Sequence, residues 1–390
     1  MRVFDVSIKF LTPAIISTKR GYRGMLYLGS SNKIPGSTIR GALMTWALRE
    51  ELVSKNELDD EVLDPKYGIT PFIATNEKLR MYHDLQIAHA LAFKFKDGLG
   101  EPRVYSIGIK ELLEEVRQRQ GAGIVDALSE LIARVSTAID LRGNELLSSS
   151  NIEDVTGQPV RLEGSAWKIC DNVSQGLYIG TGIDRSRRSV VPGVLFGYEY
   201  VRPGSTYAGI IACEENSIMF EIIKELMRLS GKAKVSIGKG VGRGYGVASI
   251  HVREAEAIQV SSKVRGSNYI ALEVIGPTAM QPPLDSNQLP IPRPIFPSDS
   301  LNICRDGKCL KLSIKAVYGG ETTVGGWSLR TSSPKLSFSA LSHGSIVIAE
   351  VDGDLGVLDL IPYLGINNLA SQGYNILLPL IEDFLPRYGG

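Results

Sequence analysis

A glycine-rich stretch carries the residue types that most clearly suggest chemistry in this sequence. From Gly238 to Gly246 every second residue is glycine, and Lys239, Arg243 and Tyr245 stand between the glycines. Glycine allows close backbone approach and positive φ angles, and the two cations could bind phosphate. The stretch fits neither the dinucleotide-binding pattern nor the P-loop, because the required third glycine and the required Gly-Lys-Ser/Thr end are both missing. A nucleotide-dependent enzyme is therefore only a minor alternative, and no cofactor is expected.

Positive charge is unevenly distributed although the formal net charge is only +1. Seven lysines and arginines and no acid lie between Asp5 and Glu50, and six with no acid lie between Glu225 and Glu254. Such segregation favours a local positive surface for a polyanion on an otherwise neutral protein. For either run alone, chance clustering on a solvated face is the plainer alternative.

The composition is that of an ordinary globular protein, with 43% hydrophobic residues. No apolar run approaches the roughly 20 residues that span a bilayer, and Asp5 and Lys9 interrupt the first apolar segment. We expect a cytoplasmic protein with no membrane partner. Cys304 and Cys309 flank a predicted turn and lack further nearby ligands, so reduced cysteines at a hairpin are favoured over a zinc site, and no metal is expected.

The first 250 residues predict strands and helices in a recognisable order. Alternating apolar residues predict a strand over 2–11, and an apolar stripe predicts a helix over about 38–53, capped by Ser37 or Thr38. A second amphipathic helix begins at a cap on Asn216 and stops at Gly231, and a strand follows the glycine-rich stretch. Together with an intervening hairpin, these elements follow the β–α–β–β–α–β order of a ferredoxin-like domain.

A chain of 390 residues is long for one domain. We expect a first ferredoxin-like domain over 1–260 with an insertion at about 55–175, and a smaller ferredoxin-like domain over 261–390. Seven prolines place an extended excursion at 276–300 within the second domain. The predicted fold class is α+β, with antiparallel sheets packed by helices.

Three segments together resemble the RAMP superfamily of CRISPR RNA-guided effector complexes. They are IPGSTIRGAL (34–43), GIDRSRRSVVPGVLFGYEYVRPGSTYAGII (182–211) and IGKGVGRGYGVASI (237–250). In that family a Pro-Gly-Ser turn into the first helix, an Asp-Arg hairpin and a glycine-rich loop follow one another in this order. The segment VGGWSLRTSSPKLSFSALSHGSIVIAE (324–350) looks like part of the Cas-five-like subunits of type III complexes, with III-D as the closest subgroup.

This resemblance implies a subunit that binds RNA and does not turn it over. Such subunits hold the 5′ handle of the guide RNA and touch the large Cas-ten subunit and the first Cas-seven-like backbone subunit. Lysines and arginines would contact guide phosphates, which set affinity without reading bases. The RNA-binding candidates are Lys19, Arg20, Arg23, Gly36, Ser37, Thr38, Arg40, Arg185, Arg187, Arg188, Gly238, Lys239, Gly240, Gly242, Arg243, Gly244, Tyr245, Trp327 and Lys335.

Some of these assignments have open alternatives. Tyr245 and Trp327 could stack on unpaired bases, but packing in the core is at least as plausible for each. The arginines of 185–188 could face a protein neighbour instead of RNA. The C-terminal counterpart of the glycine-rich loop, at 364–377, contains no arginine, which favours packing over RNA binding.

No catalytic residue is expected. Slicing backbone subunits of the family hold a metal with an aspartate between the first strand and the first helix, but the corresponding segment, 17–36, contains no Asp or Glu. Asp184 more plausibly braces its hairpin. A Cas-six-like repeat-processing ribonuclease remains an alternative, although none of the four histidines, at 83, 89, 251 and 343, lies in the N-terminal basic region. A Cas-seven-like backbone subunit is a second alternative.

Overall fold

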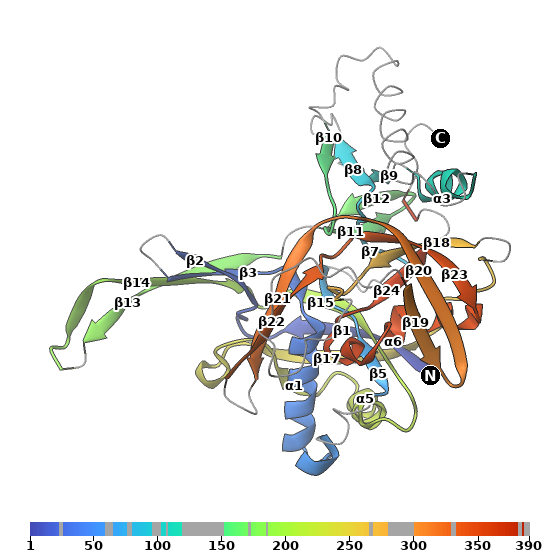
Figure 1. Cartoon of the computed structure of the whole chain (residues 1–390). Helices are drawn as coiled ribbons and strands as arrows, with labels where there is room; N and C mark the ends of the chain where they lie inside the picture. Colours follow the sequence, from blue (N-terminus) through green and yellow to red (C-terminus); the bar gives the residue numbers. More distant parts are fainter. Residues whose placement is uncertain are drawn as a thin grey trace. The chain divides into compact units, whose positions relative to one another are not determined.

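The computed structural model describes residues 1–22, 26–58, 65–75, 80–95, 103–106, 108–118, 152–170, 173–184, 186–264, 268–279, 300–328, 333–380 and 384–385. The chain forms two compact units, one of residues 1–81 with 171–256 and one of 82–170 with 257–390 (Figure 1). This division differs from the predicted one, which assigned the whole insertion of 55–175 to the first domain. Residues 82–170 belong to the second unit because their apolar side chains pack there. Tyr82, for example, meets Tyr363 edge to face.

The sheet of the first unit has the ferredoxin-like arrangement that the sequence predicted. Its main elements, in chain order, are β1 (Arg2–Phe10), α1 (Gly36–Arg49), β6 (Phe72–Thr75), β15 (Thr206–Cys213), α5 (Ile218–Leu229) and β17 (Val247–Ala255). The strands lie in the order β17–β1–β15–β6, and each pairs antiparallel with its neighbour. The additional strands are β4 (Lys33–Ile34), β5 (Tyr67–Ile69) and β16 (Lys234–Ser236), of which β16 extends the sheet beyond β17.

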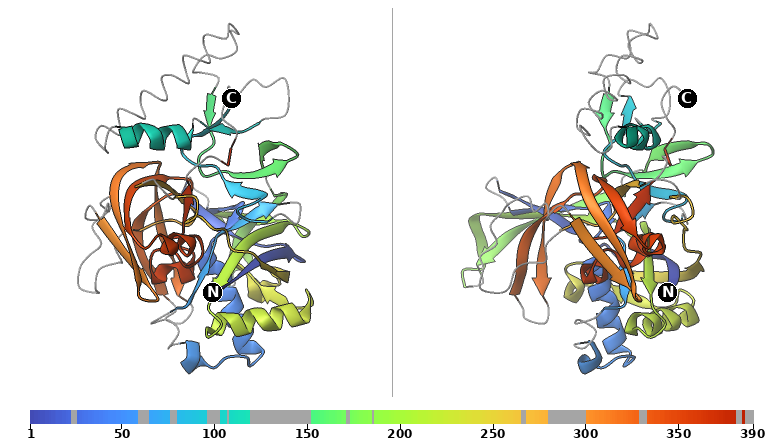
Figure 2. Two further views of the ribbon diagram at one scale, coloured as in Figure 1. Left: turned by 90° about the vertical axis from the view of Figure 1, so that its right-hand side faces the viewer. Right: turned by 45° about the vertical axis from the view of Figure 1, so that its right-hand side comes forward.

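Alternation along β1 places the core on one face of this sheet. Phe4, Val6, Ile8 and Phe10 are buried, and they share a hydrophobic core with residues of α1 and α5. Both helices lie on the same side of the sheet in the views of Figure 2. The intervening residues of β1 face the other way, and Lys9 among them is exposed. The sheet therefore has one face covered by helices. On its second face β1 carries polar side chains, whereas Ala208, Ile210 and Ala212 of β15 are buried.

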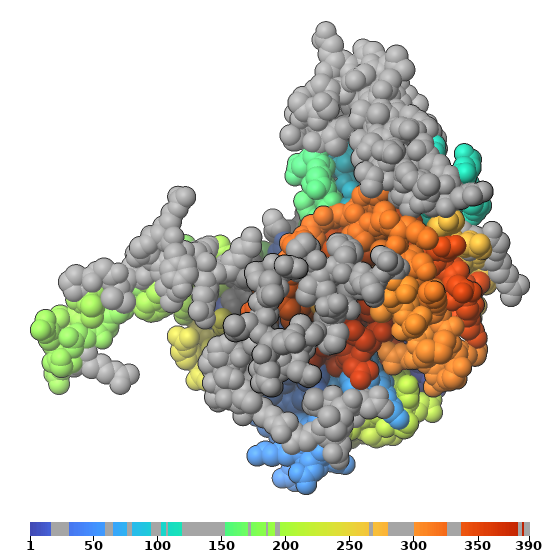
Figure 3. All heavy atoms as spheres, viewed as in Figure 1, coloured from blue at the N-terminus to red at the C-terminus, as the bar shows by residue number. Residues whose placement is uncertain are grey.

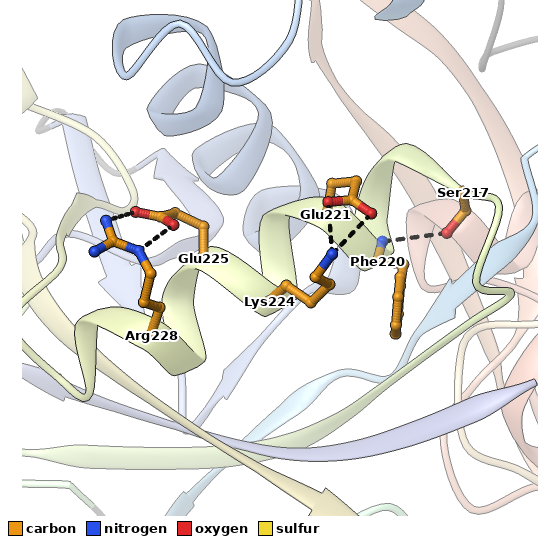
Figure 4. A network of polar contacts seen from close by, with 6 residues as sticks. All are labelled: Ser217, Phe220, Glu221, Lys224, Glu225 and Arg228. Atoms are coloured by element: carbon orange, nitrogen blue, oxygen red, sulfur yellow. Dashed lines mark hydrogen bonds and ion pairs between the residues drawn. The ribbon is translucent and has the colours of Figure 1, made fainter.

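Both helices of the first unit are capped differently from the prediction. Pro35 is the N-cap of α1 and no side chain caps it, so Ser37 and Thr38 lie in its first turn. The Pro35 ring leaves the chain extended up to the helix start, which explains the earlier beginning. In α5 the cap is Ser217 rather than Asn216, because the Ser217 hydroxyl accepts a hydrogen bond from the Phe220 amide at 3.2 Å (Figure 4).

A second sheet of the first unit is built around a long hairpin. Its strands are β2 (Ser17–Tyr22), β3 (Leu26–Ser30), β13 (Gln175–Asp184) and β14 (Ser189–Val201), in the order β13–β14–β3–β2. The expected loop over 17–36 thus contains two paired strands, because β3 adds in parallel to β14. The outer part of β13–β14 stands clear of the ferredoxin-like sheet of the same unit in Figure 1, and its tip is coloured green in Figure 3.

The second unit repeats the ferredoxin-like strand order. Its sheet runs β19–β20–β23–β18–β24, with bounds Ser300–Arg305, Lys308–Tyr318, Ile346–Gly353, Tyr269–Val274 and Leu377–Leu380. The 3₁₀ helices η4 (Leu355–Asp359) and η5 (Asn368–Gln372) and the short helix α6 (Ile361–Leu364) connect β23 to β24. A hairpin of β21 (Glu321–Ser328) and β22 (Ser333–Leu341) follows β20. The proline-rich residues 280–299 lie outside the described part of the chain.

The insertion adds small sheets and one described helix to the second unit. Its elements are β7 (Leu85–Ile87), β8 (Ala92–Phe95), β9 (Tyr105–Ser106), α3 (Ile109–Gln118), β10 (Ile152–Asp154), β11 (Pro159–Glu163) and β12 (Ala166–Ile169). Helix α3 packs against β18. None of the helices that the structure describes is long and apolar enough to cross a membrane.

The predicted turn between Cys304 and Cys309 is confirmed, but the cysteines are not reduced. Asp306 and Gly307 both have positive φ and form the two-residue turn between β19 and β20. Because Cys304 and Cys309 are directly opposite each other, with Cα atoms 4.1 Å apart, their sulfurs can bond, and the structure holds them as a disulfide. The expectation of free thiols was wrong because it did not consider this pairing register.

Loss of this disulfide should lower the stability of the second unit. The double substitution Cys304→Ser/Cys309→Ser is expected to reduce the free energy of unfolding by about 2 kcal/mol, since the closed loop is short. Denaturant unfolding with and without reductant measures the effect. The wild type should lose stability in reductant and the double variant should be insensitive to it. Equal sensitivity of both proteins would contradict the pairing.

Candidate nucleic-acid interface

The glycine-rich stretch is a loop with a 3₁₀ turn at its tip. The turn covers Val241–Arg243, and Gly240 and Gly244 on either side are left-handed. At the base, the Ile237 amide donates to the Gly246 carbonyl at 2.8 Å. The loop is also tied to the chain after β1, because the Lys239 amide donates to the Ile15 carbonyl at 3.0 Å and the Gly246 amide to the Pro13 carbonyl at 2.7 Å.

The glycines are required in this loop for two separate reasons. Gly238, Gly240, Gly244 and Gly246 have positive φ angles, which side-chain-bearing residues rarely adopt. A Cβ on Gly246 would also lie 2.1 Å from the Ile237 carbonyl oxygen. Gly242 has neither constraint. The expectation of close approach and positive φ angles is therefore confirmed.

This loop presents its cations at the surface. Lys239 and Arg243 are both exposed, and so are the tip residues Val241, Gly242 and Gly244. The loop emerges from β16, which α1 contacts. The backbone hydrogen bonds at the loop base fix the conformation of the loop that carries the two cations. Binding of an anion would therefore cost less conformational entropy than binding to a flexible loop.

Tyr245 joins the loop to the long hairpin of the same unit. Its hydroxyl lies 3.2 Å from the Tyr198 hydroxyl, and the two rings meet edge to face with centroids 6.0 Å apart. Burial and the hydrogen bond with Tyr245 raise the pKa of Tyr198 to about 12, and the charge of Arg243 acts in the opposite direction. Tyr245 is half-buried, and this contact shows that it braces the loop against β14.

Tyr198 belongs to a series of aromatic residues that the sequence reasoning did not select. On one face of the hairpin, Tyr198 pairs with Tyr178, and the rings stack with centroids 4.8 Å apart. The neighbouring pairs, Gly180 with Phe196 and Gly176 with Tyr200, place rings where a Cβ on either glycine would lie. The alternation of glycine and aromatic residues in GLYIG and FGYEY was the signal that could have revealed this face.

The hairpin tip is organised by Asp184. Its carboxylate accepts hydrogen bonds from the Ser186 amide at 2.8 Å, the Ser186 hydroxyl at 2.7 Å and the Arg187 amide at 3.1 Å. These bonds lower the pKa of Asp184, with the Ser186 hydroxyl as the largest cause. Arg187 and Arg188 are exposed beside it. The expectation that Asp184 braces the hairpin is confirmed.

Four of the predicted RNA-binding residues lie in the first part of α1. Gly36, Ser37 and Thr38 form its first turn, and no acidic residue lies there. Arg40 is committed in part to structure, because its Nε donates to the Tyr67 hydroxyl at 2.7 Å. Just before the helix, burial lowers the pKa of Lys33 to about 8.

Several predicted contacts cannot be placed in this site. Arg23 and Arg185 lie outside the described residues. Lys19 and Arg20 are on β2, Trp327 is on β21 and Lys335 is on β22, but their side chains are outside the description. Strand register places Arg20 opposite Leu28, which in turn pairs with Tyr198.

The C-terminal segment 364–377 packs inward. Asn375 is fully buried, and its side chain donates to the Ala279 carbonyl at 2.7 Å and accepts from the Ala279 amide at 2.8 Å. A Cβ on Gly276 would lie 2.4 Å from the Gly373 carbonyl oxygen, so these backbones are in close contact. The favoured packing role agrees with this geometry. Within the described residues, no three His, Cys, Asp or Glu side chains gather as a metal site would require.

Comparison with known proteins identifies the family. Residues 7–249 match the model of the RAMP superfamily. No curated protein sequence is a significant match. A cryo-EM structure of the Type III-B Cmr-beta bound to cognate target RNA has 15% identity and a TM-score of 0.43, over 96% of each chain. A CRISPR associated protein Cas6 has 8% identity and a TM-score of 0.38, over 97% of this chain and 99% of that one.

The crystal structure of Pyrococcus furiosus Cmr4 (Cas7) has 10% identity and a TM-score of 0.26, over 65% of this chain and 100% of that one. The family match spans α1, α5, the glycine-rich loop and the long hairpin of the first unit. The chain therefore belongs to the RAMP superfamily.

Proposed function

We propose that this chain is a non-catalytic RNA-binding subunit of a type III CRISPR effector complex. In this proposal it holds the 5′ handle of the guide RNA, beside a large Cas-ten subunit and a Cas-seven-like backbone subunit. The observation that carries the proposal is the glycine-rich loop, which has a constrained backbone and exposes Lys239 and Arg243. Family membership and the resemblance of 324–350 to Cas-five-like subunits support it.

Two cations on a rigid loop suit a phosphate backbone better than a base edge. Lysine and arginine bind phosphate oxygens without discriminating sequence, and exposed glycine amides can approach the strand closely. Because the Tyr245 hydroxyl is hydrogen-bonded to Tyr198, the proposal does not include base stacking on Tyr245 or on any other residue of the loop. Affinity would then be strongly salt-dependent and weakly sequence-dependent.

Removal of the two loop cations should weaken RNA binding. The variant Lys239→Ala/Arg243→Ala is expected to bind a repeat-derived RNA at least tenfold more weakly at low salt, since a hydrogen bond to a charged group contributes about 1.5–3 kcal/mol. The slope of log affinity against log salt should shrink by about 1.4, at about 0.7 per lost phosphate contact. Fluorescence anisotropy over a salt series measures both quantities.

A matched control separates local contacts from general charge. Lys224 and Arg228 on α5 are paired with Glu221 and Glu225 (Figure 4), so Lys224→Ala/Arg228→Ala removes the same formal charge from paired sites. This control should bind RNA as the wild type does. An unchanged salt slope in the loop variant would refute the proposal, and specific cleavage of repeat RNA by the purified chain would replace it with a ribonuclease.

A further inference from the structure

On the sheet face opposite the helices, a row of hydrogen-bond donors crosses the exposed half formed by β16, β17 and β1 and reaches β15. Lys234, Ser249, Lys9 and Thr206 are consecutive cross-strand partners on β16, β17, β1 and β15. Residues directly opposite each other in an antiparallel sheet point to the same side. Since Val235, Ala248 and Ile8 are buried in the helix-covered core, this donor row lies on the other face.

The adjacent row adds a third lysine. Lys232 precedes β16, and because Ala233 and Val235 are both buried, Lys232 and Lys234 point away from the core. The His251 ring in the middle of β17 lies against Gly231, where a Cβ would be 2.1 Å from it, so His251 packs on the turn that carries Lys232. Lys9, Lys232 and Lys234 are all exposed.

These three lysines lack the carboxylates that neutralise other cations of the unit. Arg253 on β17 is 2.7 Å from Asp5, and Arg2 on β1 is 2.7 Å from Glu254. By contrast, no described acidic side chain forms an ion pair with Lys9, Lys232 or Lys234. The Thr206 hydroxyl can also donate a hydrogen bond, whereas the Ser249 hydroxyl donates to the Lys9 carbonyl at 3.5 Å. None of the four residues of the row is an acid.

Protection of a sheet edge does not account for this pattern. Lysine on an edge strand discourages pairing with another chain, and β16 is such an edge. Lys9, however, is on β1, which pairs with β15 on one side and β17 on the other. An interior strand has no edge to protect, so charge complementarity to an anion is the better explanation.

The donor row lies close to the glycine-rich loop. Lys234 is three residues before Ile237 at the base of that loop, which is about 10 Å of extended chain. Lys9 and Lys234 are separated by two strand spacings, about 9.6 Å, which suits successive contacts to a polymer rather than one small anion.

We propose that Lys9, Lys232 and Lys234, with the Thr206 hydroxyl, bind the phosphates of a single-stranded RNA on the exposed half of this sheet face. This surface would extend the track that begins at the glycine-rich loop, and in that respect it rests on the proposed function. The lysines add a second set of contacts, which an RNA bound at the glycine-rich loop reaches only if it is long enough to extend onto the sheet.

RNA length distinguishes the two sets of contacts. The variant Lys9→Gln/Lys232→Gln/Lys234→Gln is compared with wild type on polyuridine of about 4 and about 16 nucleotides, a range typical of single-strand sites. The control Arg2→Gln/Lys224→Gln/Arg228→Gln removes the same charge from ion-paired residues of the same unit. Circular dichroism melting verifies that both variants are folded.

The expected result is a length-dependent loss. On the longer RNA, the slope of log affinity against log salt concentration should be smaller by about 2 for the lysine variant, at about 0.7 per lost phosphate contact. The control variant should keep the wild-type slope. On the short RNA, both should equal wild type. An unchanged salt slope of the lysine variant on the longer RNA would overturn the donor-row proposal. It would also be overturned if the lysine variant bound RNA as the wild type does but no longer co-purified with a protein that the wild type retains, because the lysines would then bind that protein.

Failure of this proposal is distinguishable from failure of the proposed function. The loop variant Lys239→Ala/Arg243→Ala is measured on the same two RNAs. If it is weakened on both while the lysine variant is not, the loop binds RNA and the sheet face does not. If only the lysine variant is weakened on the longer RNA, the sheet face binds RNA and the loop proposal fails.

Discussion

Gly246→Ala is expected to destabilise the first unit by about 3 kcal/mol or more and to abolish RNA binding by the loop. Alanine in the left-handed region costs about 1–2 kcal/mol. The new Cβ would also lie 2.1 Å from the Ile237 carbonyl oxygen, a separation that real structures do not contain. The hydrogen bond between Ile237 and Gly246 closes the loop base, so the loop cannot relieve this contact without opening.

Two other glycines of the loop provide graded controls. Gly244 has a φ of 84° and open space at its Cβ, so Gly244→Ala should cost only the backbone term of about 1–2 kcal/mol. Gly242 has ordinary φ and open space, so Gly242→Ala should change stability by less than about 0.5 kcal/mol. Urea unfolding of the three variants measures the series. Equal effects at 242 and 246 would contradict the described loop.

Glu273→Gln is expected to stabilise the second unit at neutral pH. Glu273 is fully buried on β18, and neither of its carboxyl oxygens has a hydrogen-bond partner in the described part of the chain. Burial raises the pKa of Glu273 well above its ordinary value of 4.5. A charged carboxylate without partners is strongly disfavoured in such surroundings, whereas glutamine keeps the shape and cannot ionise.

The sign of the pH dependence follows from the raised pKa. Between pH 4.5 and the folded pKa, the folded state binds a proton that the unfolded state has released, so wild-type stability falls as pH rises. The advantage of Glu273→Gln should be absent near pH 4 and should grow by about 1.4 kcal/mol per pH unit above 4.5 until the folded pKa is reached.

An exposed acid of the same sheet provides the control for this measurement. Glu350 on β23 is 2.9 Å from Lys315 and partly exposed, so Glu350→Gln should shift stability by less than about 1 kcal/mol and in the opposite direction. Urea midpoints of both variants between pH 4 and pH 8 decide the question. A parallel pH profile for wild type and Glu273→Gln would show that Glu273 is not buried without partners.

Local patterns in the sequence predicted the elements that bury a clear apolar face. Strand β1 alternates, and α5 has an apolar stripe with its stop at Gly231, so both were correctly expected. The glycine-rich loop could be predicted because positive φ angles require glycine regardless of tertiary context. The order of these elements was sufficient for the ferredoxin-like prediction, although residues 76–205 separate β6 from β15. Strand β6 lies in the predicted insertion, and the hairpin β13–β14 forms a separate sheet.

Features that depend on distant partners could not be predicted in this way. Strands β2 and β3 have no strong alternation. They are strands because β3 pairs with β14 and β2 pairs with β3. The Tyr198–Tyr245 contact joins residues 47 apart, which no local spacing reveals. The predicted cap of α1, Ser37 or Thr38, lies two or three positions after Pro35, where no side chain caps the helix. The predicted cap of α5 is one position from Ser217, since asparagine and serine are both suited to capping.

The central claim is that the chain holds the 5′ handle of a guide RNA, and sequencing the RNA that co-purifies with it tests this most directly. The tagged chain is isolated from cells that express repeat-derived guide RNA, alongside Lys239→Ala/Arg243→Ala and Gly242→Ala. We expect a discrete RNA with one shared 5′ end on the wild type and on Gly242→Ala, and strong depletion on the loop variant. Absence of RNA on the wild type, or RNA with random 5′ ends, would contradict the claim.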